Sequence, residues 1–447
     1  MAGTYLLRTL TSTGNRKLWT WSAWIKKAIP DGTEMGLFGL YEDGANYFRI
    51  RYKSDQRLGI DNVEGNTTNM SLILGTEHRD VSGWYHLVVK YDSAQSTASN
   101  RVKIYVNGVL QTVFQSSTYP SQNANTYFPV NALPLNVGRT TNNKYFDGSM
   151  SHIHFTDGYA YDASAFGSTD STTGEWKINT SPSVTYGTNG FFILKDNGAK
   201  TDQSGNGNNF SEEGTPGIVS NTQDNPSNVF ATWNPLIGRH TNGTNLVPTL
   251  SNGNTTSFSD GSTWQVGLST LATSSGKYYT EVKWISDSNT RYSEIGLYEV
   301  DAFAQKITGY PYMPDMANCY GLRDSDGKIR TGGSATSYGV SYGPSNIISV
   351  AMDLDNNKLY YAKDGVWMNS ANPSSGTGGF SIIANKTYAF GLQQYAVGNI
   401  TFSTNFGNGY FGTTAVSSAG SNASGNGIFE YDVPTGFTAL STKGLNT

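Results

Sequence analysis

Two carboxylates in one short segment are the closest approach in this chain to a catalytic acid pair. Hydrolysis of a glycosidic bond needs two carboxyl groups flanking that bond. Glu299 and Asp301 are two residues apart, and on a strand this spacing directs both side chains to the same face. A catalytic run of the form Glu-x-Asp-x-x-Glu would need a third acid where Ala304 stands. We therefore predict that both acids lie in a solvated loop after a strand over 295–298, and that the chain is not an enzyme.

A pair of histidines offers two imidazoles on one face of a predicted strand. His152 and His154 are two residues apart, but neither a His-Glu-x-x-His motif nor a cysteine partner of a zinc site accompanies them. We predict a surface pair beside Asp157 with no metal bound.

A segment rich in carboxyl and amide oxygens has part of the character of a calcium loop. Asp202, Asn206 and Asn208 carry the oxygen ligands that calcium prefers, but the terminal bidentate glutamate is missing. The composition is typical of a turn. Whether the 202–208 loop holds an ion is left open.

The single cysteine limits both redox and metal chemistry. Cys319 excludes an intramolecular disulfide, and one thiol cannot build a cysteine-rich metal site, so a small half-buried residue is predicted there. No glycine-rich segment ends in Gly-Lys-Ser or Gly-Lys-Thr, which would cradle phosphates. We predict no catalytic residue, no metal and no cofactor.

Aromatic side chains are the remaining chemical signal. Exposed tyrosine and tryptophan rings stack on sugar rings, while asparagine, aspartate and glycine backbone supply hydrogen bonds. Tyrosine is also amphipathic and covers sheet edges and subunit interfaces, so both interpretations stay open. No binding residue is assigned, and the candidates in predicted loops are Tyr145, Tyr159, Tyr161, Tyr310, Tyr312 and Tyr342.

The composition excludes several classes of protein. The chain has 447 residues, a net charge of −4 and 14% charged residues, well below the roughly 25% of an ordinary soluble domain. This balance excludes a broad electrostatic footprint for nucleic acid. The longest aliphatic–aromatic runs, such as 191–194, are four residues long, so no membrane insertion is expected. The amino terminus has no apolar stretch typical of a secretory signal.

Alternation of apolar and polar residues runs through the chain and predicts half-buried strands. In 47–53, apolar residues at 48, 50 and 52 alternate with three basic residues. The dipeptide Asn107-Gly108 favours a type I′ turn, so a hairpin is predicted over 101–114. Residues 349–368 read as a three-strand meander. Since no long window has helical periodicity, the predicted fold class is all-β.

A polar segment without alternation divides the chain. Residues 211–228 contain two prolines and predict a linker. The flanking parts each have a suitable length for one sandwich. We predict two antiparallel β-sandwich (jelly-roll) domains in tandem, over 1–210 and 229–447, the second with a C-terminal tail.

The first part resembles the laminin-G/concanavalin-A-like lectin and glucanase superfamily. The resemblance covers about residues 1–200, implies a β-sandwich, and lacks the glucanase acids. It rests on WTWSAWIKK (19–27), GWYHLVVKYD (83–92), RVKIYVNGVL (101–110), NVGR (136–139) and YFDGSMSHIHF (145–155), in that order.

The second part is similar to a SPRY domain. Such domains bind protein partners through variable loops and have no catalysis, and no binding residue is carried over. The resemblance rests on GKYYTEVKW (276–284), IGLY (295–298), YGLRDSDGKI (320–329), ISVAMDLDNNKLYYAKDGVWM (348–368), YAFGLQ (388–393) and ITFSTNFG (400–407).

The pairing of these two parts is similar to structural proteins of marine tailed bacteriophages: tail fibres, appendages or head decorations. This resemblance implies a non-enzymatic virion protein that is located in the particle, self-associates, and docks to other virion proteins. It also implies contact with a host-surface glycan or protein. Two alternatives stay open: a carbohydrate-binding lectin module, and a glycosidase acting on host polysaccharide. The position on the particle, the oligomeric state and the host receptor are left open.

Overall fold

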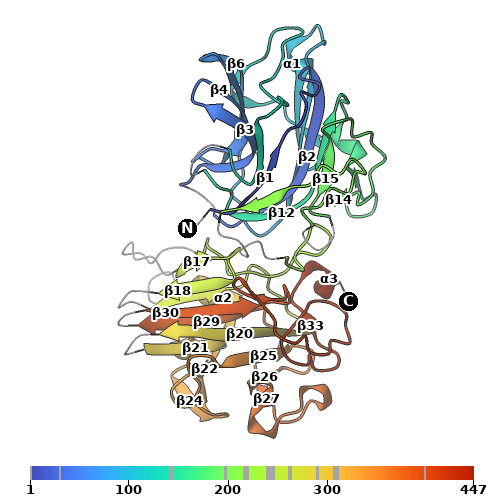
Figure 1. The fold of residues 1–447 in the computed structure, drawn as a ribbon. Coiled ribbons are helices and arrows are strands. Elements are labelled where there is room, and N and C mark those ends of the chain that lie inside the picture. The colour runs from blue at the N-terminus through green and yellow to red at the C-terminus, as the bar shows by residue number, and fades with distance from the viewer. Residues whose placement is uncertain are drawn as a thin grey trace. The chain divides into compact units, whose positions relative to one another are not determined.

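The chain folds into two compact units, Met1–Asn221 (unit 1) and Thr222–Thr447 (unit 2) (Figure 1). Each unit has its own hydrophobic core. The computed structural model describes residues 3–29, 32–140, 144–195, 199–214, 221–237, 247–259, 264–287, 291–305, 312–396 and 399–446. Nearly all regular structure in these residues is antiparallel β-strand. The predicted fold class, two all-β sandwiches, is confirmed.

Unit 1 has two large sheets. The first contains, in spatial order, β10 (Phe114–Thr118), β6 (Thr67–Glu77), β5 (Arg57–Glu64), β4 (Asn46–Tyr52), β3 (Met35–Asp43), β11 (Pro134–Val137), β1 (Tyr5–Thr9) and β16 (Ser211–Glu213). The second contains β15 (Phe191–Ile193), β12 (Gly148–Asp157), β2 (Leu18–Lys27), β7 (Tyr85–Asp92), β8 (Val102–Val106) and β9 (Val109–Leu110). Smaller elements are α1 (Ala98–Arg101), η1 (Ala163–Ala165), β13 (Gly167–Thr169) and β14 (Trp176–Ile178).

The core of unit 1 lies between these sheets and is aromatic. Trp19 is fully buried, and its ring stacks on Tyr91 with centroids 5.2 Å apart and planes at 7°. On β4, Phe48, Ile50 and Tyr52 are fully buried, as the alternation predicts. The basic residues between them therefore lie on the outer face of the eight-stranded sheet.

The predicted hairpin over 101–114 is only partly correct. β8 and β9 pair around Asn107 and Gly108, whose φ angles of 47° and 78° fit a type I′ turn. The strand then ends at Leu110, and Phe114 starts β10, which pairs with β6 in the other sheet. The chain changes sheet here because the edge of β6 offers unpaired backbone groups.

Unit 2 also has two large sheets. The first contains β17 (Thr249–Ser251), β18 (Thr256–Ser259), β30 (Ile400–Asn405), β20 (Lys277–Asp287), β25 (Ile347–Asp353), β26 (Lys358–Lys363), β27 (Val366–Trp367), β28 (Phe380–Ser381) and β33 (Thr438–Ala439). The second contains β19 (Gln265–Leu268), β29 (Tyr388–Ala396), β21 (Arg291–Glu299), β22 (Tyr320–Arg323), β23 (Lys328–Thr331) and β24 (Ser334–Ser337). Smaller elements are α2 (Val300–Gln305), η2 (Met313–Asp315), η3 (Met368–Ser370), η4 (Pro373–Ser375), β31 (Tyr410–Phe411), β32 (Thr414–Ala415) and α3 (Thr442–Leu445). The predicted meander is β25, β26 and β27.

The C-terminal tail packs on the outer face of the nine-stranded sheet of unit 2. Phe429 and Phe437 are buried there in a small cluster with Tyr279 and Tyr360. β33 pairs in parallel with β20. The tail is therefore part of the sandwich.

The predicted linker over 211–228 is wrong at its beginning. Ser211–Glu213 forms β16 and pairs with β1, because the free edge of β1 is available to it. Further along, the amide of Gln223 donates to the carbonyl of Asn408 within unit 2. The segment entering unit 2 and the end of that unit also meet, since Phe230 and Ser441 form a β-bridge.

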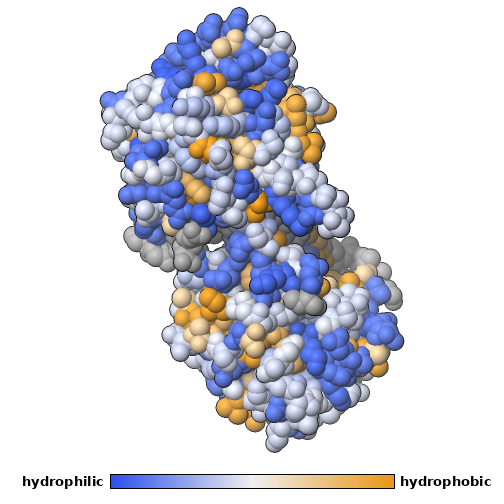
Figure 2. All heavy atoms as spheres, turned by 90° about the vertical axis from the view of Figure 1, so that its right-hand side faces the viewer, coloured by the Kyte–Doolittle hydropathy of each residue, from blue (hydrophilic) through white to orange (hydrophobic). Residues whose placement is uncertain are grey.

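The surface of each unit is mostly hydrophilic or neutral on the face shown in Figure 2, with hydrophobic residues in small scattered patches. No helix in the described part of the chain is long and apolar enough to cross a membrane.

Candidate functional site

The two acids considered for glycoside hydrolysis are separated by the end of a strand. Glu299 ends β21 and is only 1% exposed. Its carboxylate accepts a hydrogen bond from the backbone amide of Ala302 at 2.8 Å. It thereby caps α2, where Asp301 is exposed. The prediction of a solvated loop is wrong, because a carboxylate at the start of a helix satisfies free backbone N–H groups.

The two histidines lie inside unit 1, so the predicted surface pair is wrong. β12 is bulged between Ser151 and His154. Nδ1 of His152 lies 2.7 Å from Oγ of Ser151, and Nδ1 of His154 lies 3.0 Å from the hydroxyl of Tyr186. Burial holds the pKa of His154 well below its usual value. In the described ranges, no group of three or more His, Cys, Asp and Glu is arranged to hold a metal ion.

The 202–208 loop uses its oxygens for internal hydrogen bonds. Each carboxylate oxygen of Asp202 accepts two hydrogen bonds. Oδ1 accepts from the amides of Phe192 and Ser204. Oδ2 accepts from the Ser204 hydroxyl and the amide of Asn208. The amide group of Asn206 donates to the carbonyls of Gly187 and Gly190. The loop is thus a hydrogen-bonded turn.

The candidate tyrosines do not form one site. Tyr159 and Tyr161 stack at 6.3 Å, and Tyr159 is 41% exposed. Tyr342 is buried and donates to the carbonyl of Leu322. Tyr310 lies outside the described residues, and Tyr145 and Tyr312 are half-buried.

Cys319 is fully buried, which corrects the half-buried prediction, and burial raises the pKa of its thiol to about 12.

Sequence reasoning missed a serine–histidine contact. Ser22 Oγ lies 2.9 Å from His86 Nε2, while His86 Nδ1 accepts the indole N–H of Trp176 at 2.9 Å. Because an indole nitrogen only donates, Nδ1 carries no proton, and Nε2–H donates to Ser22. Burial also lowers the pKa of His86 to about 3. In this arrangement His86 cannot accept the serine proton, so the pair is structural.

Sequence reasoning also missed a Gly-x-Ser-x-Gly match at 339–343. In a nucleophile elbow the serine sits between a strand and a helix. Ser341 instead lies in the connection between the strands β24 and β25, and its carbonyl accepts a hydrogen bond from the ammonium group of Lys363. The described histidines all belong to unit 1, namely His78, His86, His152 and His154. The match therefore lacks the elbow geometry, and the described residues of unit 2 include no histidine.

The outer face of the eight-stranded sheet carries a continuous row of mostly polar residues. Register places one residue from each strand in this row, with Gly39 and Asn136 at neighbouring positions near its middle. No sequence motif reveals this row, because its members come from eight strands that are far apart along the chain. Its members, in order, are Thr118, Ser71, Asp61, Arg49, Gly39, Asn136, Leu7 and Ser211.

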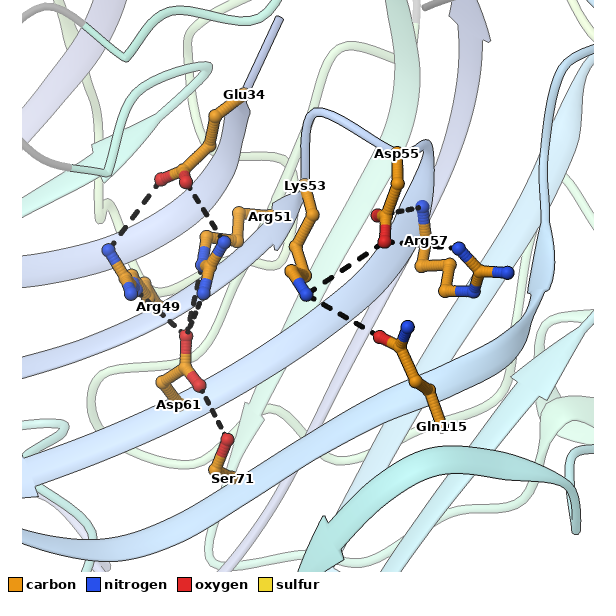
Figure 3. A network of polar contacts seen from close by, with 9 residues as sticks. All are labelled: Glu34, Arg49, Arg51, Lys53, Asp55, Arg57, Asp61, Ser71 and Gln115. Atoms are coloured by element: carbon orange, nitrogen blue, oxygen red, sulfur yellow. Dashed lines mark hydrogen bonds and ion pairs between the residues drawn. The ribbon is translucent and has the colours of Figure 1, made fainter. Parts of the chain in front are cut away.

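A network of ion pairs fixes two guanidinium groups on this face (Figure 3). Arg49 and Arg51 both contact one carboxylate oxygen of Asp61 at 2.9 Å. Arg51 also pairs with Glu34 at 2.9 Å, and Ser71 donates to the other oxygen of Asp61. The charges are balanced, and the half-buried guanidinium of Arg49 lies over the ring of Tyr47, 4.8 Å from its centroid.

The positions beside Arg49 combine a glycine with an unpartnered polar atom. Gly39 has no side chain, and a Cβ there would lie 2.6 Å from the carbonyl oxygen of Phe48. Asn136 is 5% exposed, and its side-chain oxygen has no hydrogen-bond partner. The half-buried rings of Tyr41 and Tyr47 lie next to these positions, 6.4 Å apart. We call Gly39, Tyr41, Tyr47, Arg49 and Asn136 the sheet-face site.

Comparison with known proteins finds a family match for part of unit 1. Residues 4–164 match the family of the concanavalin A-like lectin/glucanases superfamily, which confirms the lectin-like resemblance of this segment. Similar solved structures include a native heptameric SAP-like pentraxin from Limulus polyphemus, with 15% identity over 36% of this chain and 72% of that chain and a TM-score of 0.27. The SPRY domain of human HERC1 is 13% identical over 32% of this chain and 83% of that chain, with a TM-score of 0.25. A human SPRY domain is 13% identical over 34% of this chain and 90% of that chain, with a TM-score of 0.24. A search of curated proteins found no match.

Proposed function

We propose that this chain is a non-catalytic carbohydrate-binding protein, and that unit 1 binds glycan at the sheet-face site. One observation carries the proposal: the buried side-chain oxygen of Asn136 has no partner, and Gly39 beside it has no side chain. An unpaired buried polar atom costs about 1–3 kcal/mol. A sugar hydroxyl that donates to the side-chain oxygen of Asn136 would relieve this cost.

The neighbouring side chains suit the same ligand. Tyr41 presents ring surface to the apolar C–H groups of a sugar, and Arg49, which lies over the Tyr47 ring, adds planar donors that its ion pairs hold in place. A rigid donor set binds with less loss of side-chain entropy. The lectin-like fold of the matched segment is compatible with this role.

A glycan array probed with the full chain tests the proposal. We expect binding that Asn136→Leu weakens at least tenfold, because leucine keeps the volume and removes the amide. Thr118→Ala is the matched control, since Thr118 is an exposed member of the same row, and should leave binding unchanged. No binding by the wild-type chain, or equal binding by the Asn136→Leu variant, would overturn the proposal.

We also propose a second, wider role: display in several copies on a bacteriophage particle, docked to other virion proteins and in contact with the host surface. It is supported by the resemblance of the paired parts to phage structural proteins. Repeated weak sites on one particle raise effective concentration, and a symmetric homo-oligomer would supply them. Mass spectrometry of purified particles tests virion location, and absence of the chain would contradict it. Light scattering tests self-association.

We propose no catalytic activity, because Glu299 and Asp301 have separate surroundings. Reducing-sugar release from host polysaccharide that Asp301→Asn abolishes would contradict this and restore the glycosidase alternative.

A further inference from the structure

Aromatic side chains form a ladder on the outer face of the six-stranded sheet of unit 2. Tyr292 of β21 and Tyr395 of β29 are direct cross-strand partners, with ring centroids 6.1 Å apart. Trp264, which precedes β19, lies 5.3 Å from Tyr395. Tyr312 closes one side edge-on, 5.5 Å from the Trp264 ring. Segments distant in the sequence thus bring four rings together.

The ladder points away from the core of unit 2. Ile295 on β21 and Leu392 on β29 are buried in that core. Side chains an odd number of positions away along the same strand, such as Tyr292 and Tyr395, therefore face outward. Tyr292 is 39% exposed, and Trp264 and Tyr395 are half-buried. Partly exposed aromatic groups at one place on a surface are typical of binding sites.

The next row of the sheet supplies polar groups with unused hydrogen-bonding capacity. Glu294 pairs with Gln393 across the two strands, and each lies two residues from a ring of the ladder. Both are 0% exposed. Arg323 donates twice to one carboxylate oxygen of Glu294. The other oxygen of Glu294 and the amide nitrogen of Gln393 have no partner.

We propose that Trp264, Tyr292 and Tyr395 form a second glycan-binding site, a stacking platform for a neutral pyranose ring. The platform belongs to unit 2 and shares no residue with the sheet-face site. Apolar C–H groups of the sugar lie on the rings, and the polar row beside them orients hydroxyl groups at the edge of the sugar. The ion pair of Glu294 with Arg323 balances the local charge, so an uncharged sugar fits better than an acidic one.

An extended proline-rich peptide also packs against aromatic grooves. The unpaired carboxyl oxygen and amide nitrogen favour the sugar, because such a peptide presents few donors to a carboxylate. The peptide is therefore an outcome of the test that would overturn the proposal.

Titration calorimetry of the full chain tests the platform with cellohexaose, mannohexaose and chitohexaose as neutral probes and decaproline as the peptide probe. We expect at least one oligosaccharide to bind, with affinity reduced at least fivefold by Tyr292→Ala and by Trp264→Ala. Trp264→Phe, which keeps a ring, should lose less. Val366→Ala removes a 73% exposed apolar group from the other sheet of unit 2 and should have no effect.

The outcomes separate the two glycan sites. Binding weakened by Tyr292→Ala and unchanged by Asn136→Leu supports the platform, whatever the result for the sheet-face site. Binding weakened only by Asn136→Leu supports the sheet-face site and overturns the platform. The platform is also overturned if none of the three oligosaccharides binds, or if decaproline alone binds. Because Tyr292 is exposed, its variant keeps the test decisive if Trp264→Ala fails to fold.

Discussion

The backbone amide of Tyr431 donates a hydrogen bond to the carboxylate of Glu281 at 2.8 Å, across 150 residues of sequence. The amide of Glu430 donates to the other oxygen of the same carboxylate, also at 2.8 Å. Glu281 is fully buried on β20. One acidic side chain thus holds the C-terminal tail against the sheet of unit 2.

The stability of unit 2 is expected to fall as pH rises from about 4.5 to about 7. Burial raises the pKa of Glu281 from 4.5 to about 7, so over this range the folded chain binds more protons than the unfolded chain. Stability contributed by the protonated form is then lost with rising pH. Each pKa unit corresponds to about 1.4 kcal/mol, which gives about 3 kcal/mol for this group.

Urea unfolding followed by tryptophan fluorescence at several pH values checks this expectation. Glu281→Gln should reduce the slope of unfolding free energy against pH. The slope that is left belongs partly to Glu294, whose pKa burial also raises to about 7. The unfolding free energy of the wild type minus that of Glu281→Gln should fall between pH 4.5 and 7. A difference that rises with pH would contradict the raised pKa of Glu281.

Gly39→Ala is expected to destabilise unit 1 by about 1–3 kcal/mol, the range for an overpacked position. The new Cβ would lie 2.6 Å from the carbonyl oxygen of Phe48 in β4, so the two strands would have to separate. Gly65→Ala is not a suitable control, because Gly65 has a φ of 58°. Gly44→Ala is suitable, since nothing lies within 4 Å of its Cβ position. Equal denaturation midpoints for the two variants would show that the contact between the new Cβ and Phe48 does not destabilise unit 1.

Calcium is expected to leave the melting temperature of the chain unchanged. The oxygens of Asp202 already accept four hydrogen bonds, including one from the buried amide of Phe192. Asp202→Ala should therefore cost about 2–4 kcal/mol of unfolding free energy, with or without calcium. Differential scanning calorimetry with calcium or with a chelator measures both effects. A rise in melting temperature that depends on calcium and on Asp202 would establish an ion site instead.

Ser22 is expected to be unreactive toward a fluorophosphonate probe. A nucleophilic serine needs a base that accepts its proton, whereas His86 donates to Ser22 because Trp176 occupies its other nitrogen. Mass spectrometry of probe-treated native chain reads this out directly, with Ser22→Ala as the blank. A probe adduct on the Ser22 peptide would show that the tautomer inferred for His86 is wrong.

Local patterns in the sequence were sufficient to predict strands such as β4 but not how the strands meet. Phe48, Ile50 and Tyr52 alternate with basic residues because one face of β4 is buried, and a period of two records this fact directly. The pairing of β1 with β16 joins residues about 200 positions apart. Nothing in the local composition of 211–213 distinguishes an edge strand from a linker.

The candidate binding residues were harder to predict for the same reason. Asn136, Gly39 and Arg49 become neighbours only through the register of three strands. The burial of His154 was also hidden, because a bulge with a positive φ of 47° at His152 interrupts the expected alternation along β12. Tyr312 was an aromatic candidate in the sequence, but its ring contact with Trp264 could not be predicted without the fold.

Both units close on themselves: β1 pairs with β16 in unit 1, and Phe230 bridges Ser441 in unit 2. Entry and exit of the chain are therefore adjacent in each unit. Such a unit tolerates circular permutation, because its original ends can be joined by a short peptide while new ends are opened in an exposed turn. For the same reason either unit can be inserted into a surface loop of another protein as a cassette, without forcing the host backbone apart.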